Sequence, residues 1–239
     1  MTTRPDTAMV LAAGLGTRMR PLTDDRPKPL IPVAGKALID YALDGLDRGG
    51  VARAVVNVHY FAHAVEAHLA GRRAPAITVS DERGALLETG GGLAKARPLF
   101  AGAPAVFCTN TDAILVDGPS GDPYARLADA WRPEEADMLL MLAPIGETSG
   151  YSGAGDIFMS PDGRLTFRGE ADRAPFVFTG LQILNTDVLD AAPGGAFSTK
   201  VLWEAAQRAG RLRGVVHDGF WLHVGDPAGL AAAEARLGG

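Results

Sequence analysis

Short apolar runs alternate with amphipathic segments through about the first 140 residues of the chain. The apolar runs that indicate buried strands are residues 9–13, 54–58, 76–79 and 105–108. Between these runs, the spacing of apolar residues predicts helices after Pro32, over residues 61–69 and after Gly92. Strands that alternate with helices form βαβ units, so this order predicts a mainly parallel sheet.

The pattern changes after another buried run at residues 138–142. Residues 144–155 contain four glycines and predict a flexible stretch, which is a candidate lid. Two short runs, 157–159 and 165–167, flank a Pro-Asp-Gly turn and predict a hairpin. The elements expected to follow are a strand over residues 176–184, a helix over about 199–209, a strand near Val215 and a last helix opened by Asp226 and Pro227.

The length and composition of the chain are sufficient for a full hydrophobic core. With 239 residues, of which 47% are hydrophobic and 21% charged, the chain can form one large α/β domain over residues 1–239. We expect residues 1–143 to form a three-layer, doubly wound part with a mainly parallel sheet, and residues 144–239 a small β-rich annex. The single cysteine, Cys108, lies in an apolar run and is expected to be a buried hydrophobic residue.

Charge and hydropathy exclude two classes of partner. The formal net charge of −5 argues against a nucleic-acid partner, because nucleic-acid binders are usually basic. Any anion site must therefore be local. No apolar run approaches the roughly 18 residues that a membrane span needs, so we expect no membrane partner and a cytoplasmic location.

A glycine-rich turn follows the first predicted strand. Gly14 and Gly16 lack the side chains that would keep a ligand away from the backbone amides, which can donate to phosphate oxygens. Arg18 offers a planar fork to two phosphate oxygens, and Lys28 offers a compact ammonium to one. Met19 stands where the dinucleotide-binding motif has its third glycine, and the chain contains no Walker motif. The turn therefore predicts a polyphosphate site of another kind.

Two further polar motifs follow predicted strands, at residues 88–92 and 110–112. Ligands of open α/β sheets collect beyond the carboxyl ends of the strands, so we expect these motifs and the glycine-rich turn to share one cleft. The glycines at 90–92 would let the backbone approach a base or ribose, and Glu88 and Thr89 can supply hydrogen bonds; a plain loop at a helix start is the alternative. Asp112 could hold a divalent ion against a triphosphate, or simply form a turn.

The glycine-rich turn and its flanking residues resemble the N-terminal signature of the sugar-1-phosphate nucleotidyltransferases, L-A-A-G-x-G-T-R-M-x-P-L-T followed by P-K-P-L. Residues 11–23 and 27–30 match it almost completely. Within that family, the L-E-T-G-G-G run at 87–92, the absence of an E-K-P segment and the length are most similar to the short bacterial N-acetylmuramate-1-phosphate uridylyltransferases. The resemblance covers nearly the whole chain. It implies a Rossmann-like nucleotidyltransferase fold whose annex binds the sugar.

The resemblance also implies roles for individual residues. It implies that Arg18 and Lys28 are catalytic, and that nucleotide is bound by Leu11, Ala12, Ala13, Gly14, Gly16, Thr17, Glu82, Thr89, Gly90, Gly91 and Asn110. Contacts with the sugar phosphate are implied at Gly155, Glu170 and Gly180. Asp112 is implied to be a ligand of Mg²⁺, with Mn²⁺ as the alternative.

One departure from the family concerns the metal site. Where the family has W-x-D-V-G-T, this chain has Trp221-Leu-His-Val-Gly-Asp, which puts His223 at the position of the second metal-binding aspartate. Strand alternation still allows His223 to point into the cleft, and a neutral imidazole suits Mn²⁺ or Zn²⁺ better than Mg²⁺. Asp226 is a further candidate ligand, although it equally fits a helix N-cap before Pro227.

The implied reaction joins a nucleoside triphosphate and a sugar 1-phosphate. An oxygen of the sugar phosphate attacks the α-phosphorus in line, pyrophosphate leaves, and a nucleotide sugar forms. UTP and N-acetylmuramate 1-phosphate are the expected substrates, which implies a role in recycling cell-wall peptidoglycan. The alternatives are a mannose-1-phosphate guanylyltransferase, a glucose-1-phosphate nucleotidyltransferase and, in another class, a non-catalytic nucleotide-sugar sensor. Both a monomer and a small homo-oligomer are compatible with the sequence.

Overall fold

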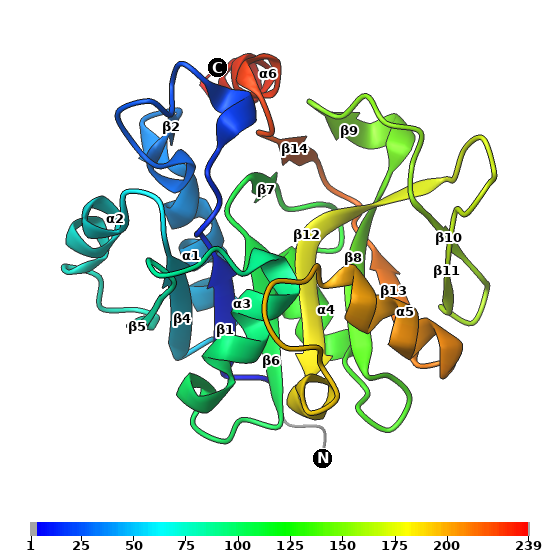
Figure 1. The fold of residues 1–239 in the computed structure, drawn as a ribbon. Coiled ribbons are helices and arrows are strands. Elements are labelled where there is room, and N and C mark those ends of the chain that lie inside the picture. Colours follow the sequence, from blue (N-terminus) through cyan, green and yellow to red (C-terminus); the bar gives the residue numbers. More distant parts are fainter. Residues whose placement is uncertain (1–3, 239) are drawn as a thin grey trace.

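The computed structural model describes residues 4–238 and is built on one large sheet with helices on both faces (Figure 1). Among these residues, nine strands form the main sheet, and the path of seven of them runs β11-β10-β12-β6-β1-β4-β5; β8 pairs with β12, and β13 pairs with β8. The strands are β1 (Thr7–Leu11), β4 (Arg53–Val58), β5 (Ala76–Asp81), β6 (Ala105–Asn110), β8 (Met138–Pro144), β10 (Ile157–Met159), β11 (Leu165–Phe167), β12 (Phe176–Asn185) and β13 (Leu212–Val216).

The first half of the chain forms the parallel part of this sheet. β1 pairs in parallel with both β4 and β6, and β4 pairs in parallel with β5. Alternate side chains of β1 enter opposite cores, since Ala8 and Val10 belong to one cluster of buried residues and Met9 to the other. Both faces of β1, β4 and β6 are buried, which explains their mostly apolar sequences, and the predicted parallel sheet is confirmed.

Helices cover both faces of the sheet. One core contains Ile39 of α1 (Leu38–Arg48), Val65 of α2 (Ala62–Leu69) and Leu127 of α4 (Pro123–Ala130). The other contains Leu93 of α3 (Glu88–Ala96) and Leu202 of α5 (Lys200–Arg208). The three-layer α/β fold predicted from the sequence is therefore confirmed.

The second half of the chain adds antiparallel strands to the same sheet. β12 pairs antiparallel with β6, β8 and β10, and the predicted hairpin is present as β10 and β11. The register between β12 and β8 shifts between Phe178 and Gln182, where Gly180 has a φ of +97°. The strands of the annex thus extend the main sheet, and its boundary near residue 143 stays a prediction.

A smaller layer lies at one end of the molecule, at the top of Figure 1. It contains the sheet β7-β14-β9 and the last helix, α6 (Pro227–Leu237). The strands are β7 (Ala113–Leu115), β9 (Thr148–Ser149) and β14 (Trp221–His223). A third buried cluster joins Met19, Leu222 and Ala233, so this layer holds the glycine-rich turn against α6. A two-stranded hairpin, β2 (Pro32–Val33) and β3 (Lys36–Ala37), leads into α1.

Several local details were not predicted from the sequence. α3 begins at Glu88 rather than after Gly92, so the three glycines at 90–92 lie inside the helix. α4 was not predicted; it begins at Pro123, and the Asp122 carboxylate caps it by accepting from the N–H of Ala125 at 2.9 Å. In residues 144–155, expected to be a flexible stretch, a 3₁₀ turn leads into β9, which pairs with β14.

Cys108 lies in the middle of β6, opposite Met9 of β1 and Gln182 of β12. Its side chain is buried, as predicted, and burial raises the pKa of the thiol to about 12. Within the described part of the chain, no helix is long and apolar enough to cross a bilayer.

Candidate active site

A pocket of about 320 Å³ lies beyond the carboxyl ends of β1, β4 and β6, and we call it the strand-end pocket. The predicted residues that line it are Leu11, Ala12, Ala13, Gly14, Gly16, Thr17, Arg18, Lys28, Glu82, Thr89, Asn110 and Asp112. Glu88 lines it as well. The turn after β1, the start of α3 and the end of β6 therefore share one cleft, as the topological argument required.

The two glycines of the turn are in different situations. Gly16 has a φ of +63°, and a Cβ built there would lie 3.0 Å from the Cβ of Lys28, so the turn itself requires glycine. A Cβ at Gly14 would meet nothing within 4 Å. The space beside Gly14 opens into the strand-end pocket, where a ligand can approach the backbone.

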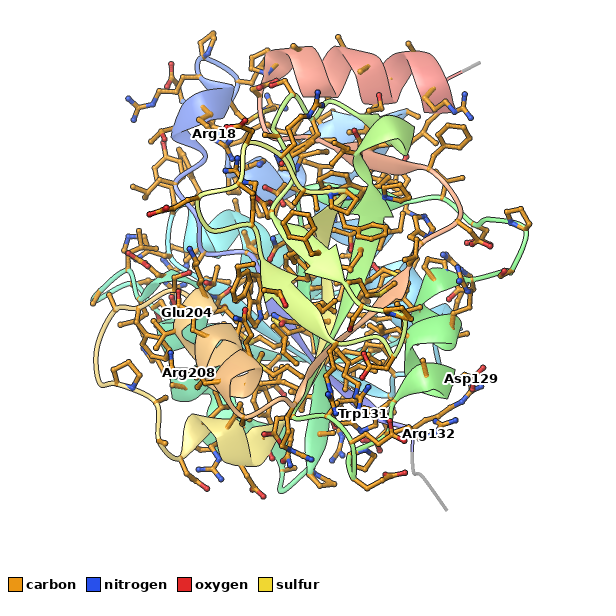
Figure 2. The ribbon with its side chains drawn as sticks, turned by 90° about the vertical axis from the view of Figure 1, so that its right-hand side faces the viewer. Arg18, Asp129, Trp131, Arg132, Glu204 and Arg208 are labelled. Atoms are coloured by element: carbon orange, nitrogen blue, oxygen red, sulfur yellow. The ribbon has the colours of Figure 1, made fainter. Side chains whose placement is uncertain are left out.

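Arg18 and Lys28 bring positive charge to one side of the pocket. Arg18 is exposed, and none of the carboxylates whose side chains the structure describes forms an ion pair with it. Figure 2 shows Arg18 at the end of the molecule that carries α6, away from Asp129 and Arg132 at the opposite end. The guanidinium of Arg18 is therefore available to an anion.

Lys28 and Asp112 form an ion pair. The Nζ atom of Lys28 lies 2.8 Å from Oδ2 of Asp112, and the two side chains are only 12% and 22% exposed. Burial by itself raises the pKa of Asp112, but the hydrogen bond and charge of Lys28, with smaller contributions from His223 and Arg18, together hold that pKa below its usual value. Asp112 is thus a carboxylate at neutral pH.

A chain of hydrogen bonds forms the side of the pocket nearest β4 and β5. The backbone N–H of Ala12 donates to Oδ1 of Asn57 at 2.7 Å, and Nδ2 of Asn57 donates to Oε1 of Glu82 at 2.9 Å. The Glu82 side chain is fully buried, and burial raises the pKa of its carboxyl group. Its other oxygen, Oε2, has no hydrogen-bond partner among the described residues.

Asn57 was not predicted as a site residue. The signal was present, because Asn57 is the one polar residue of an otherwise apolar run at 54–58, and it lies near the carboxyl end of its strand. The other lining residues that were not predicted are Pro29, Leu86, Thr111 and Gly225. Pro29, Thr111 and Gly225 lie within the motifs at 27–30, 110–112 and 221–226, whereas Leu86 lies in no such motif.

His223 is placed beside Asp112 by strand pairing. β14 runs antiparallel to β7, with His223 opposite Ala113, and the N–H of Val224 donates to the carbonyl oxygen of Asp112 at 2.9 Å. Burial lowers the pKa of His223, Asp112 opposes that shift, and the cations Lys28 and Arg18 add to it. The imidazole is therefore neutral at physiological pH.

The remaining metal candidate, Asp226, has a structural contact. Its carboxylate accepts from the N–H of Gly229 at 2.9 Å and caps α6. In residues 4–238, no three His, Cys, Asp or Glu side chains gather as a metal-binding cluster. Any ion here would need further ligand oxygens, from water or from a bound phosphate.

The predicted residues Gly90 and Gly91 do not line the pocket. A Cβ at Gly90 would lie 2.4 Å from the ring of Phe197, and one at Gly91 would lie 2.4 Å from the carbonyl oxygen of Gly195. In the structure, these glycines let α3 pack closely against the segment before α5.

The three predicted sugar-phosphate residues also lie outside the strand-end pocket. A Cβ at Gly180 would lie 3.2 Å from the Cβ of Asn110, which does line the pocket. Gly155 packs against Ala174, and Glu170 is exposed in the turn after β11. Their role stays a prediction.

Comparison with known proteins adds independent findings. The family model described as "Nucleotidyl transferase" matches residues 7–238. The chain is 49% identical to the N-acetylmuramate alpha-1-phosphate uridylyltransferase of Caulobacter vibrioides over 99% of both chains. It is 33% identical to the protein of the same name from Neisseria meningitidis serogroup B, over 97% of this chain and 98% of the relative.

Among solved structures, the fold is similar to that of the inositol-1-phosphate CTP transferase of T. maritima. The TM-score is 0.81 at 20% identity, and the alignment covers 99% of this chain and 96% of the other. At that identity, the similarity concerns the fold alone.

Proposed function

Because the chain belongs to the nucleotidyl transferase family, its reaction is nucleotidyl transfer, and we propose that UTP and N-acetylmuramate 1-phosphate are its substrates. An oxygen of the sugar phosphate forms a bond to the α-phosphorus of UTP as the bond to pyrophosphate breaks. The products are UDP-N-acetylmuramate and pyrophosphate. The observation that carries the substrate assignment is the 49% identity, over 99% of both chains, to a relative with that activity in its name.

The proposed role of the glycine-rich turn is to bind the triphosphate. Arg18 and the backbone amides of residues 14–17 would hold the β- and γ-phosphates, which become the leaving group. Lys28 would neutralise the α-phosphate, where negative charge builds up during the attack. Support comes from the open space beside Gly14 and from the exposed guanidinium of Arg18.

The nucleoside would occupy the side of the pocket lined by Asn57, Glu82 and Leu86. This assignment follows from charge: a carboxyl group repels phosphate but accepts from the N–H and O–H groups of a base or ribose. Leu11, Ala12, Ala13, Thr89 and Asn110 would complete the nucleotide contacts, and Gly155, Glu170 and Gly180 those of the sugar phosphate.

A divalent cation, Mg²⁺ or Mn²⁺, would be held by Asp112 with His223 beside it. The donor set fits, since Mg²⁺ commonly takes one carboxylate together with substrate phosphate oxygens, and the neutral imidazole favours Mn²⁺. When bound, such an ion supplies positive charge to the phosphate oxygens of the nucleotide. Asp226 is left to cap α6.

The test is an assay of pyrophosphate release. UTP, GTP, CTP, ATP and dTTP are each combined with the 1-phosphates of N-acetylmuramate, N-acetylglucosamine, mannose and glucose, in Mg²⁺ or Mn²⁺. We expect UTP with N-acetylmuramate 1-phosphate to give the highest kcat/KM, and Lys28→Ala to lower kcat by about 10²- to 10³-fold. A preference for GTP and mannose 1-phosphate would overturn the substrate assignment. Tight binding of a nucleotide sugar without turnover would indicate a sensor instead.

A further inference from the structure

The ion pair between Lys28 and Asp112 occupies the carboxylate to which the proposed function gives the metal. Nζ of Lys28 lies 2.8 Å from Oδ2 of Asp112, and both side chains are mostly buried. A partly buried pair of this kind is costly to break unless each charge finds a new partner. In the structure, the counterion of Asp112 is therefore Lys28.

The charge around Asp112 also opposes a free cation. Lys28 and Arg18 carry two positive charges against the single negative charge of Asp112, and all three residues line the pocket. Two other carboxyl groups line the pocket, Glu82 and Glu88. Glu82 follows β5, whereas Asp112 follows β6, and β1 and β4 lie between these two strands. At the usual strand spacing, β5 and β6 are roughly 14 Å apart. Glu88 begins α3, which packs on β1 and β4.

A triphosphate reverses this balance. It brings several negative charges and new acceptors for an ammonium group, so Lys28 can exchange Asp112 for a phosphate oxygen. Lysine suits such an exchange, because its ammonium is a compact charge on a flexible stem, whereas arginine would form a fixed two-point pair with the carboxylate.

We propose that Lys28 acts as a lock on Asp112 that keeps free divalent cations out of the empty site and opens when nucleotide binds. The cation then enters only with the triphosphate, and binding is ordered. This inference rests on the proposed function, because it takes Asp112 as the metal ligand. Lys28 would thus have two roles. It would block Asp112 before nucleotide binds, and it would contact the α-phosphate afterwards.

The experiment measures binding of Mn²⁺ alone to the nucleotide-free protein, by the loss of the electron paramagnetic resonance signal of free Mn²⁺. We expect the wild type to bind Mn²⁺ weakly, and Lys28→Met to bind it about 10-fold more tightly or better. Adding Asp112→Asn to Lys28→Met should abolish the gain. Equal affinity of the wild type and Lys28→Met would overturn the proposal.

Arg18→Gln is the matched control, since it removes the same charge from the pocket without freeing Asp112. We expect it to change Mn²⁺ affinity by much less than Lys28→Met does. A gain equal to that of Lys28→Met would show that overall charge, and not the lock, excludes the ion. Circular dichroism verifies folding, and Lys28→Gln replaces Lys28→Met if the latter is unfolded.

A second measurement uses only the wild type. Its Mn²⁺ uptake is compared with and without a non-hydrolysable UTP analogue, and we expect protein-bound Mn²⁺ only with the analogue. Uptake that is equally tight without the analogue contradicts the lock, while the pyrophosphate assay can still support the proposed function. The opposite outcome is also distinguishable. If no sugar phosphate gives pyrophosphate release, the proposed function is wrong. If Lys28→Met still gains Mn²⁺ affinity that depends on Asp112, the lock is supported.

Discussion

At the scale of single residues, Gly14 and Gly16 allow a direct test of the glycine-rich turn. Gly16 has a φ of +63° and a crowded Cβ position, so Gly16→Ala should lower the free energy of unfolding by about 1 kcal/mol or more. Gly14→Ala should change it by less than about 0.5 kcal/mol, because nothing lies within 4 Å of the new Cβ. If the open space beside Gly14 receives phosphate, Gly14→Ala should nevertheless raise the KM for UTP by at least about 10-fold. Urea unfolding and steady-state kinetics check both results, and an unchanged KM would argue against this binding mode.

Glu82 predicts a pH dependence of stability. Burial raises the pKa of its carboxyl group above the ordinary 4.5, so the folded form holds the proton more tightly than the unfolded form. The stabilisation from this proton is complete below pH 4.5 and is lost as pH rises through the raised pKa. Glu82→Gln does not titrate, so relative to the wild type it should gain stability between about pH 5 and pH 8. Urea unfolding of both proteins at the two pH values measures the difference, and a constant difference would contradict the prediction.

Single residues also show what the sequence could predict of the site. Arg18, Lys28 and Asp112 are charged residues within or just after motifs that follow predicted strands, and topology brings such residues together. The ion pair between Lys28 and Asp112 joins residues 84 positions apart and could not be read from the chain. The bridge from Ala12 through Asn57 to Glu82 depends on the positions of three neighbouring strands in the same way.

At the scale of elements, α3 shows how a local pattern can mislead. Three consecutive glycines normally disfavour a helix, and the sequence therefore predicted a loop there. The structure places them within the first turns of α3, where Phe197 and Gly195 approach too closely for side chains. Those partners lie more than 100 positions further along the chain, beyond the reach of a window-based prediction. The short strands β7 and β9 escaped prediction because, unlike the equally short β10 and β11, they do not flank a recognisable turn motif.

The packing of α3 gives a prediction with a matched control. Gly91→Ala would place its Cβ 2.4 Å from the carbonyl oxygen of Gly195, so the segment before α5 has to move. We expect a loss of about 1–3 kcal/mol in the free energy of unfolding. Gly84→Ala, in the loop before α3, meets nothing within 4 Å and should have little effect. Equal effects of the two substitutions on urea unfolding would show that the close contact is not what requires glycine.

At the scale of the whole molecule, an acidic protein is expected to bind a highly charged anion. The net charge is −5, so attraction of a triphosphate depends on the local field of Arg18 and Lys28. Salt screens this field, and the KM for UTP should rise by about three- to tenfold between roughly 0.05 and 0.5 M KCl. Arg18→Gln should show a shallower dependence. If salt does not affect the KM of the wild type for UTP, the phosphates are not bound mainly by electrostatic attraction.

The central position of Cys108 makes its thiol a natural reporter. It is the only cysteine, it lies between β1 and β12, and its pKa of about 12 keeps it protonated and unreactive while the sheet is intact. An alkylating reagent can therefore label the native protein only during rare openings of the central strands. Ligands that bind the folded form make such openings rarer, so labelling should slow in the presence of UTP, and a rate that does not respond would mean that the nucleotide does not bind the folded chain. The rate at which this single thiol is alkylated would then report, without any engineered probe, how much each substrate stabilises the central strands against opening.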